Sequence, residues 1–327
     1  MMQQVADILS NIENLIAEFP LHREPQGLYA PIGYSMQNGG KRIRPLLTVL
    51  ACQMFDNQKT DDAYTPAIAW EMFHNFTLLH DDLMDNAPMR RGKPTVYTKW
   101  NANTAILSGD TMLVEAFRIL HQTKSDNFSQ IIELFTKTAE EVCEGQMFDM
   151  EFETRNNITE SEYINMIRLK TSVLIGACLK TGALTGNATH NDAQLMYDFG
   201  INLGLAFQLR DDWLDTFGNA ETFGKRIGGD IVSSKKTYLL VKLLQSASTA
   251  DSEQITFWLN RKIFDEQEKI SFITSMYKKY EIDRIGQAKV EEYGDKALQT
   301  LRQIGNNSKI DITQLQEISN KLLNRNK

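Results

Sequence analysis

The chain has 327 residues, of which 42% are hydrophobic and 24% are charged, a profile typical of a globular protein with one to three domains. Its net charge of −7 argues against a nucleic-acid partner, because phosphate backbones attract cationic surfaces. No run of about 18 apolar residues appears, so we expect no membrane span. The three cysteines, Cys52, Cys143 and Cys178, have no metal-like spacing, and we expect reduced, buried thiols in a cytoplasmic protein.

The first predicted element is an amphipathic, acidic helix over residues 1–19, which does not resemble a signal or transit peptide. Another helix is predicted to begin in the basic segment GGKRIRP at residues 39–45, because its glycines and proline mark a loop that enters a helix. Helix N-termini bind anions through their free N–H groups, and Lys41, Arg42 and Arg44 cluster at this one. We therefore predict an anion site here, with a solvated basic helix start as the alternative.

An acidic motif ends a later apolar stretch and then occurs a second time. It reads DDLMD at residues 81–85 and DDWLD at residues 211–215. On a helix, the first and last aspartates of each motif share a face, so their charges repel unless a cation lies nearby. Mg²⁺ binds carboxylate and phosphate oxygens together. The two motifs therefore predict a magnesium site.

Basic residues follow each acidic motif. After the first motif, residues 86–88 end the helix, and the arginines of RRGKP at 90–94 return on a loop above it. Arginine matches phosphate oxygens in a bidentate fork, whereas the alternative is a surface loop that pairs with neighbouring acids. After the second motif come Lys225, two glycines and Lys235-Lys236, which in isolation would indicate an exposed lysine cluster.

The rest of the chain predicts long helices. All seven prolines lie at or before Pro94, and proline is the strongest helix breaker. Apolar residues recur at spacings of three and four in segments 147–152 and 163–169, and we find no convincing strand alternation with hairpin turns. We therefore predict one all-α domain over residues 1–327 with ten or more helices.

The order of these signals, a basic loop followed twice by an acidic and then a basic segment, resembles the trans-isoprenyl diphosphate synthase (polyprenyl synthetase) family. The resemblance implies an antiparallel helical bundle, the isoprenoid synthase fold, around a deep central cavity. It also implies a homodimer that condenses isopentenyl diphosphate head to tail with an allylic diphosphate, through an allylic carbocation. The matching segments are GGKRIRP at 39–45, LLHDDLMDNAPMRRGKPT at 78–95, GQMFDM at 145–150, LKT at 169–171, FQLRDDWLD at 207–215 and FGK at 223–225.

The resemblance also implies roles for individual residues. Six aspartates, some of them in supporting places, would hold three Mg²⁺ ions: Asp81, Asp82, Asp85, Asp211, Asp212 and Asp215. The allylic diphosphate would be bound by Arg90, Lys170, Lys225 and Lys235, and isopentenyl diphosphate by Lys41, Arg44, His74 and Arg91. The dipoles of Thr171 and Gln208 would stabilise the carbocation. In one departure, Ser234 precedes Lys235 where the family more often has glycine.

Product length is the finest prediction that the resemblance allows. It places the floor of the product cavity one turn before the DDLMD motif, where Phe76 stands five residues before Asp81, beside Thr77 and one turn after Phe73. An aromatic residue there argues against products of C30 or longer. Together with an uninterrupted DDxxD motif it resembles archaeal-type geranylgeranyl diphosphate synthases, so we favour a C20 product, with C15 farnesyl diphosphate as the alternative.

Three other functions stay open at this point. His80-Asp81 is an HD dipeptide, which occurs in metal phosphohydrolases, although that class has no use for GGKRIRP. A class I terpene cyclase would share the metal chemistry but needs no site for isopentenyl diphosphate. A non-catalytic regulatory subunit of a prenyl synthase usually loses part of an aspartate motif, and both motifs are intact here.

Overall fold

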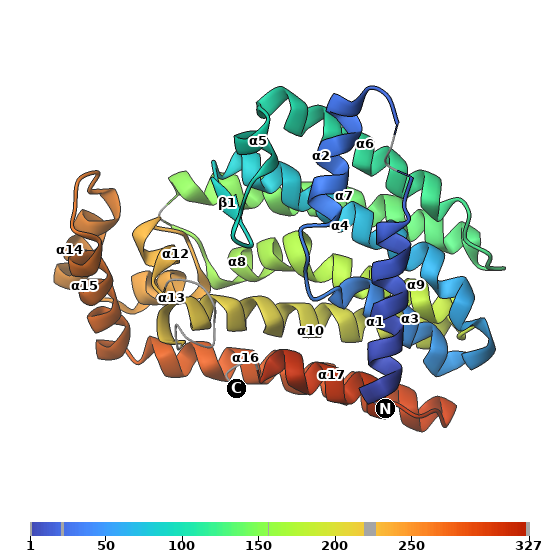
Figure 1. Ribbon diagram of the computed structural model, residues 1–327. Coiled ribbons are helices and arrows are strands. Elements are labelled where there is room, and N and C mark those ends of the chain that lie inside the picture. The colour runs from blue at the N-terminus through green and yellow to red at the C-terminus, as the bar shows by residue number, and fades with distance from the viewer. Residues whose placement is uncertain (1, 21–22, 156, 219–226, 325–327) are drawn as a thin grey trace. The chain divides into compact units, whose positions relative to one another are not determined.

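The computed structural model describes residues 2–20, 23–155, 157–218 and 227–324 (Figure 1). These residues form more than ten helices and one two-stranded hairpin, which confirms the predicted all-α class. Every described helix is too short or too polar to cross a membrane. The FGK segment at 223–225, with the predicted diphosphate ligand Lys225, lies outside the described residues.

Two compact units divide the chain. One comprises Met1–Leu134 and Cys178–Gln194, and the other comprises Phe135–Ala177 and Leu195–Lys327. The boundaries fall inside three helices: α7 (Phe128–Thr154), α9 (Val173–Thr185) and α10 (His190–Phe217). A single domain over residues 1–327 stays a prediction.

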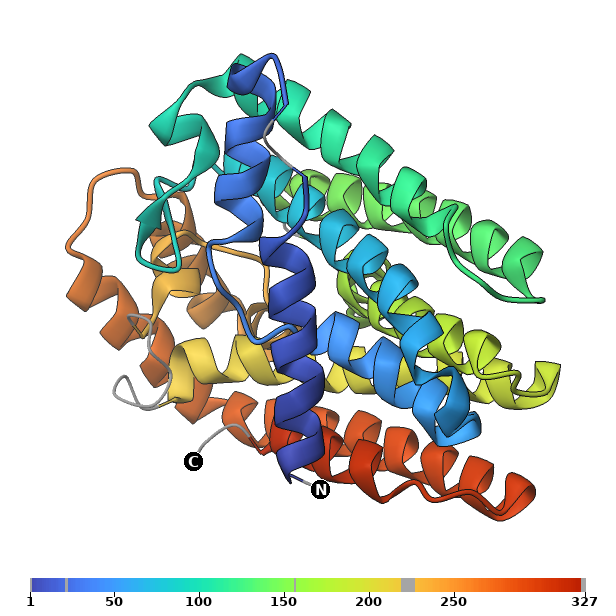
Figure 2. The same ribbon diagram turned by 45° about the vertical axis from the view of Figure 1, so that its right-hand side comes forward.

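The first unit is built around α4 (Tyr64–Met84). Its other elements include α1 (Met2–Ala17), α2 (Gln26–Met36), α3 (Ile43–Phe55), the 3₁₀ helix η1 (Asn57–Ala63), α5 (Val96–Lys99) and α6 (Ala102–Leu120). Helix α4 contacts all of these and lies side by side with α2 and α6 in both views (Figures 1 and 2). Residues on every side of α4 are buried, among them Trp70 and Phe73, as expected for a helix that is apolar on most of its surface.

Helix α4 ends in a Schellman motif at the first aspartate motif. Asn86 adopts a left-handed conformation (φ 51°), and its N–H donates to the carbonyl of Leu83 at 3.3 Å. The N–H of Ala87 reaches back to the carbonyl of Asp82 at 2.9 Å. Asparagine tolerates this conformation, and the following proline cannot continue a helix. The prediction that residues 86–88 end the helix is therefore confirmed.

The segment after this helix end forms a short hairpin, which the sequence did not predict. Strand β1 (Met89–Arg90) pairs antiparallel with β2 (Lys93–Pro94), with Arg90 opposite Lys93. Arg91 and Gly92 both have positive φ, 51° and 75°, as a two-residue type I′ turn requires. Two-residue strands are too short for any alternation to be visible in the sequence.

The second unit contains the remaining helices. They are α8 (Glu160–Ile167), the π-helical turn η2 (Arg168–Ser172), α12 (Gly229–Val232), α13 (Tyr238–Ser246), α14 (Thr249–Asn260), α15 (Glu266–Lys279), α16 (Ile282–Ser308) and α17 (Thr313–Leu323). Helix α17 folds back antiparallel along α16, since Gly305 lies beside Ile312 and Gly294 beside Leu323 (Figure 2). Buried side chains of α8, α10, α13, α15 and α16 form one core cluster.

The three cysteines lie on helices and are free. Cys52 of α3 and Cys178 of α9 are buried, as predicted. Cys143 of α7 is exposed, so the prediction of a buried thiol is wrong there. It shares an exposed, apolar face of α7 with Met147 and Met150, which are four and seven residues further along the helix.

Candidate active site

The first aspartate motif occupies the last turn of α4. Asp82 is buried, Asp81 is half-buried and Asp85 is exposed. The C-terminal end of a helix carries partial negative charge, so three carboxylates in this turn repel both one another and the helix dipole. Such a turn is stabilised by nearby cations.

Arg90 supplies one of these cations. Its Nε donates to Asp82 Oδ1 at 2.7 Å, and its Nη2 lies 3.4 Å from Asp81 Oδ2. Burial raises the pKa of Asp82 to about 6, although the adjacent Arg90 acts in the opposite direction. The hairpin thus brings a predicted diphosphate ligand directly onto the aspartate motif.

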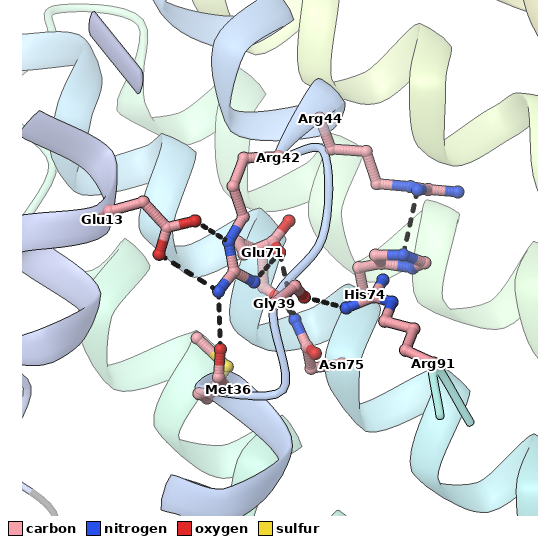
Figure 3. Close-up of polar contacts among 9 residues, drawn as sticks. All are labelled: Glu13, Met36, Gly39, Arg42, Arg44, Glu71, His74, Asn75 and Arg91. Atoms are coloured by element: carbon pink, nitrogen blue, oxygen red, sulfur yellow. Dashed lines mark hydrogen bonds and ion pairs between the residues drawn. The ribbon is translucent and has the colours of Figure 1, made fainter. Parts of the chain in front are cut away.

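Three of the four predicted isopentenyl diphosphate ligands gather around the Gly39-Gly40 loop, as Figure 3 shows. Arg44 Nη1 lies 3.0 Å from His74 Nε2, and Arg91 Nη1 donates to the carbonyl of Gly39. A Cβ on residue 40 would lie 2.8 Å from that same guanidinium nitrogen, so glycine leaves the space that Arg91 occupies. The fourth ligand, Lys41, is exposed and follows this loop directly.

His74 is neutral in this arrangement. Burial lowers its pKa well below the ordinary value, and the nearby charges of Arg44 and Arg91 lower it further. A neutral Nε2 accepts a hydrogen bond from the Arg44 guanidinium, which fixes that side chain. The direct binding of isopentenyl diphosphate by His74 stays a prediction.

Arg42 has a different place from its two basic neighbours. Its side chain is 1% exposed, and its guanidinium bonds to Glu13 at 2.8 Å, to Glu71 at 2.7 Å and to the carbonyl of Met36 at 2.7 Å (Figure 3). The expectation that Arg42 shares in an anion site is therefore wrong. It connects α1, α2 and α4 to the start of α3.

The second aspartate motif lies near the end of α10, and Asp212 is the most buried of its three aspartates. Asp212 is 4% exposed. It accepts hydrogen bonds from the Tyr163 hydroxyl, from Gln208 Nε2 at 3.1 Å and from the N–H of Tyr238 at 3.4 Å. Burial raises the pKa of Asp212 to about 7, and the charge of Asp230 adds to this, while the bond from Tyr163 opposes it. Tyr163 thus supports the motif by a hydrogen bond, and no sequence signal identified this residue.

Residues 228–235 fold back on this motif. The N–H of Asp230 donates to Asp215 Oδ2 at 2.9 Å, and the N–H of Gly228 donates to the Asp215 carbonyl at 2.6 Å. The N–H of Lys235 then donates to the Asp230 carbonyl at 2.9 Å. These bonds place the predicted diphosphate ligand Lys235, which is exposed, on a loop that is tied to the aspartate motif.

A π-helical turn carries two more predicted residues. Lys170 Nζ lies 2.6 Å from Asp149 Oδ2 of α7, and Thr171 Oγ1 donates to Gln208 Oε1 at 3.4 Å. A Cβ on Gly145 would collide with the backbone N of Lys170, so this glycine of α7 permits the close approach of the turn. The segments GQMFDM and LKT therefore contact each other, through Gly145 beside the backbone of Lys170 and through the pair of Asp149 and Lys170. The sequence did not identify Asp149 as the partner of Lys170.

Two of the three predicted floor residues, Phe73 and Phe76, belong to a row of rings on α4. Phe76 lies 5.5 Å from the ring of Phe73 and 5.0 Å from that of His80, while Phe73 lies 5.9 Å from Trp70. The His80 ring packs onto Gly109 of α6, so the row faces that helix. Thr77 lies off this row, with its hydroxyl donating to the carbonyl of His74 at 2.8 Å.

Two cavities lie within the first unit. A small one of about 20 Å³, room for about one water, lies among Asn75, Asp82, Arg90 and Arg91. A larger one of about 620 Å³ lies towards the other end of α4, near Tyr64 and Ile68, and contains none of the predicted site residues. Of these two cavities among the described residues, the small one borders the first aspartate motif.

Each aspartate motif offers donors that fit Mg²⁺ bound together with a substrate. Within the described ranges, no three His, Cys, Asp or Glu side chains are grouped closely enough to hold a metal alone. Mg²⁺ typically takes one or two carboxylates and completes its octahedron with waters and substrate phosphates. Asp81 and Asp85 on the first motif and Asp211 on the second offer such carboxylates, since they are less buried than Asp82 and Asp212.

Known proteins resemble the whole chain. A family model described as polyprenyl synthetase matches residues 25–277. The geranylgeranyl diphosphate synthase of Sulfolobus acidocaldarius is 36% identical over 308 residues, which cover 93% of this chain and 92% of that protein. A crystal structure of a geranylgeranyl pyrophosphate synthase is 41% identical with a TM-score of 0.90, and the match covers 100% of this chain and 99% of that one.

A more distant structure was solved with ligands. The polyprenyl synthase of Caulobacter crescentus CB15, complexed with calcium and isoprenyl diphosphate, is 25% identical with a TM-score of 0.85. The match covers 99% of this chain and 97% of that chain.

Proposed function

The chain belongs to the polyprenyl synthetase family and is a trans-prenyltransferase, and we propose that it condenses isopentenyl diphosphate with an allylic diphosphate to give C20 geranylgeranyl diphosphate. Several relatives at 36–37% identity are named geranylgeranyl diphosphate synthase, which favours C20 over the C15 alternative. The observation that carries the proposal is the pairing of each aspartate motif with a basic segment. Arg90 bonds to the first motif, and the loop bearing Lys235 bonds to the second.

The family uses Mg²⁺, and we propose three ions in the active site of this chain. Asp81 and Asp85 would hold two of them, and Asp211 the third. When bound, the ions neutralise negative charge that develops on the leaving diphosphate. Asp82, Asp212 and Asp215 would support the motifs, since their carboxylates already accept hydrogen bonds from Arg90, Tyr163 and the N–H of Asp230.

The protein's own cations bind the two substrates. Arg90, Lys170, Lys225 and Lys235 would bind the allylic diphosphate, and Lys41, Arg44 and Arg91 would bind isopentenyl diphosphate. His74 would keep the Arg44 guanidinium in place by accepting one of its hydrogen bonds. Oriented cations of this kind are preorganised to stabilise negative charge as it develops.

The reaction balances without a further reagent. The allylic C–O bond breaks, and its electron pair leaves with the diphosphate. The double bond of isopentenyl diphosphate attacks the allylic cation and forms the new C–C bond, and a proton leaves the adjacent carbon. The departing diphosphate would accept that proton, because the motif aspartates are assigned to the metal ions and no other obvious general base stands in the motifs. Thr171 and Gln208 present oxygen dipoles that would stabilise the cation.

Phe76 would set the product length. It is 9% exposed and is fixed between Phe73 and His80, so it has little freedom to move aside for a longer chain. Thr77 and Phe73 would complete this floor. A rigid aromatic floor supports a short product, in agreement with C20.

A homodimer and a cytoplasmic location complete the proposal. Helix α6 exposes Ile106, Leu107 and Val114, and Leu107 and Val114 are 59% and 65% exposed. Exposed apolar side chains gathered on one helix mark association surfaces. Sedimentation of the purified chain tests the dimer.

Free thiols at all three cysteines fit a reducing compartment.

The experiment that tests the function uses the purified chain with Mg²⁺, isopentenyl diphosphate and each of the C5, C10 and C15 allylic diphosphates. We expect condensation with these primers and a C20 end product identified by mass spectrometry. Absence of condensation with every primer would refute the proposal, and a C15 end product would leave the family activity but correct the length.

A further inference from the structure

Ser234 holds a backbone conformation that side chains disfavour. Its φ is 57°, in the left-handed region, at the position where we expect glycine from the family pattern. A serine there crowds its Cβ against the following carbonyl, so the conformation needs compensating contacts. The N–H of Ser234 donates to the carbonyl of Ile231 at 3.1 Å, which closes the turn after α12.

The compensating contact comes from a buried lysine. Lys269 of α15 is 1% exposed, and its Nζ donates to Ser234 Oγ at 2.7 Å and to the carbonyl of Val232 at 3.0 Å. The Ser234 hydroxyl donates in turn to the carbonyl of Leu259 at 3.1 Å. A glycine at position 234 would lack this hydroxyl, so the serine is what gives Lys269 its second acceptor.

Lys269 is unusual because its charge is buried without an acidic partner. Among the described residues, its ammonium group bonds to a carbonyl oxygen and a hydroxyl oxygen, and to no carboxylate. Two oxygens and the ring of Phe264, which lies 4.3 Å from Nζ, surround it instead. Burying an ammonium group is costly even when it is hydrogen-bonded, so a lysine here calls for a reason other than stability alone.

The loop that Lys269 holds is also tied to the second aspartate motif. Before the turn, the N–H of Asp230 bonds to Asp215, and after it the N–H of Tyr238 bonds to Asp212. Between these two points lie Ser234 and Lys235. The loop is therefore fixed to the motif by its two ends and to α15 by its middle.

We propose that Lys269 and Ser234 act as a pair of positioning residues that hold Lys235 in place to bind the allylic diphosphate. This inference rests on the proposed function. Neither residue is assigned contact with substrate. Ser234 stands where the family more often has glycine and adopts the left-handed conformation there. Its hydroxyl links the loop to the buried ammonium group of Lys269.

The test compares four variants with the wild-type protein. Lys269→Met removes the ammonium group at nearly the same volume, and Ser234→Ala removes the hydroxyl but keeps the Cβ at positive φ. Ser234→Gly removes the hydroxyl and the strain together. The matched control is Lys278→Met, which removes an exposed lysine of the same helix.

We expect Lys269→Met and Ser234→Ala each to raise KM for the allylic diphosphate by about tenfold, the loss typical of one hydrogen bond to a charged group. KM for isopentenyl diphosphate should change less than about twofold, because its predicted ligands lie elsewhere in the chain. Ser234→Gly should raise the allylic KM less than Ser234→Ala. Lys278→Met should behave as wild type.

A double variant tests the coupling. In the Ser234→Gly background, Lys269→Met should raise the allylic KM by a smaller factor than in the wild-type background, because the hydroxyl it used is already absent. Equal effects in both backgrounds, or equal rises in the two KM values, would overturn the proposal. Should Lys269→Met fail to fold, the contrast between Ser234→Ala and Ser234→Gly decides the question by itself.

Calorimetric binding of inorganic diphosphate with Mg²⁺ separates this proposal from the proposed function. If the wild type binds diphosphate and the variants weaken binding in the order expected for the allylic KM, the positioning role of Lys269 and Ser234 is supported even without condensation. If the wild type condenses its substrates but the variants bind diphosphate as tightly as it does, the positioning role is refuted and the enzyme activity stands.

Discussion

Asp82 and Asp212 are each the second residue of an aspartate motif, and both are buried. Arg90 bonds to the first, and Tyr163 bonds to the second. Both aspartates are more buried than Asp81, Asp85 and Asp211. The motifs thus contain buried aspartates, which we propose as supporting residues, and less buried aspartates, which we propose as the metal ligands.

That division predicts unequal effects of conservative substitutions. Asp81→Asn should lower kcat by about 10²–10³, the usual loss when one preorganised electrostatic contact is removed, with little change in thermal stability. Steady-state kinetics and thermal unfolding measure both quantities. The control is Asp110→Asn, which neutralises an exposed carboxylate on α6 and should keep wild-type kcat. Full activity of Asp81→Asn would remove Asp81 from the metal site.

The lowered pKa of His74 predicts that the stability of the protein depends on pH. Its pKa is lowered in the folded protein, so below its ordinary value near 6.5 the unfolded chain binds a proton that the folded chain does not. The free energy of unfolding should therefore fall as pH drops from about 6.5 to 5, by about 1.4 kcal/mol per pH unit from this group. Urea titrations of wild type and His74→Gln should show that only the wild type has this contribution. Parallel curves would contradict a neutral His74.

Phe76 gives a prediction about the product. Phe76→Ala removes a ring from between Phe73 and His80 and should lengthen the main product beyond C20, because the floor recedes. Mass spectrometry of the product measures the length. Phe257→Ala removes an exposed ring from α14 and should leave it unchanged. An unaltered product from Phe76→Ala would show that other residues set the length.

The π-helical turn η2 depends on one small residue of α7. Gly145 of α7 leaves room for the backbone of Lys170, and Lys170 pairs with Asp149 of the same helix. Single π turns inside helices are rare and frequently lie at functional sites. Here the turn displays Lys170 and Thr171 in succession.

Gly145→Ala should therefore destabilise the protein by about 1–3 kcal/mol, because its Cβ would collide with backbone that cannot easily move. Urea unfolding measures the loss. Gly27→Ala in α2, where a Cβ meets nothing within 4 Å, should change stability by less than about 1 kcal/mol and in the favourable direction. If both variants unfold at the same urea concentration, the turn tolerates more space than the structure indicates.

Helix positions could be predicted from the sequence because their signals are local. The proline map and the apolar spacing correctly indicated helices from residue 95 onward, and NAP at 86–88 marked the end of α4. The hairpin could not be predicted, since two-residue strands show no period and only the Arg91-Gly92 turn hints at it. The π turn likewise differs from an α-helix by hydrogen bonding that leaves no periodic signal.

Across the whole molecule, the contacts that the sequence did not predict join residues that are far apart in the chain. Arg42 was grouped with Lys41 and Arg44 by adjacency, yet it bonds to Glu13 and Glu71. Tyr163 and Lys269 carry no motif, and their partners lie 49 and 35 residues away. The ordered acidic and basic segments were enough to predict the family and the candidate ligands, but the choice of partners for each charge depends on tertiary packing.

The most direct test of the central claim follows both substrates at once. The purified chain is given Mg²⁺, isopentenyl diphosphate and C15 allylic diphosphate, and C20 diphosphate and inorganic diphosphate are measured together. We expect the two to form in equal amounts, to stop on addition of EDTA and to resume with Mg²⁺. A prenyl alcohol would indicate a phosphohydrolase, a hydrocarbon formed without isopentenyl diphosphate would indicate a cyclase, and no reaction would indicate a regulatory subunit. Any of these three results would contradict the proposed condensation.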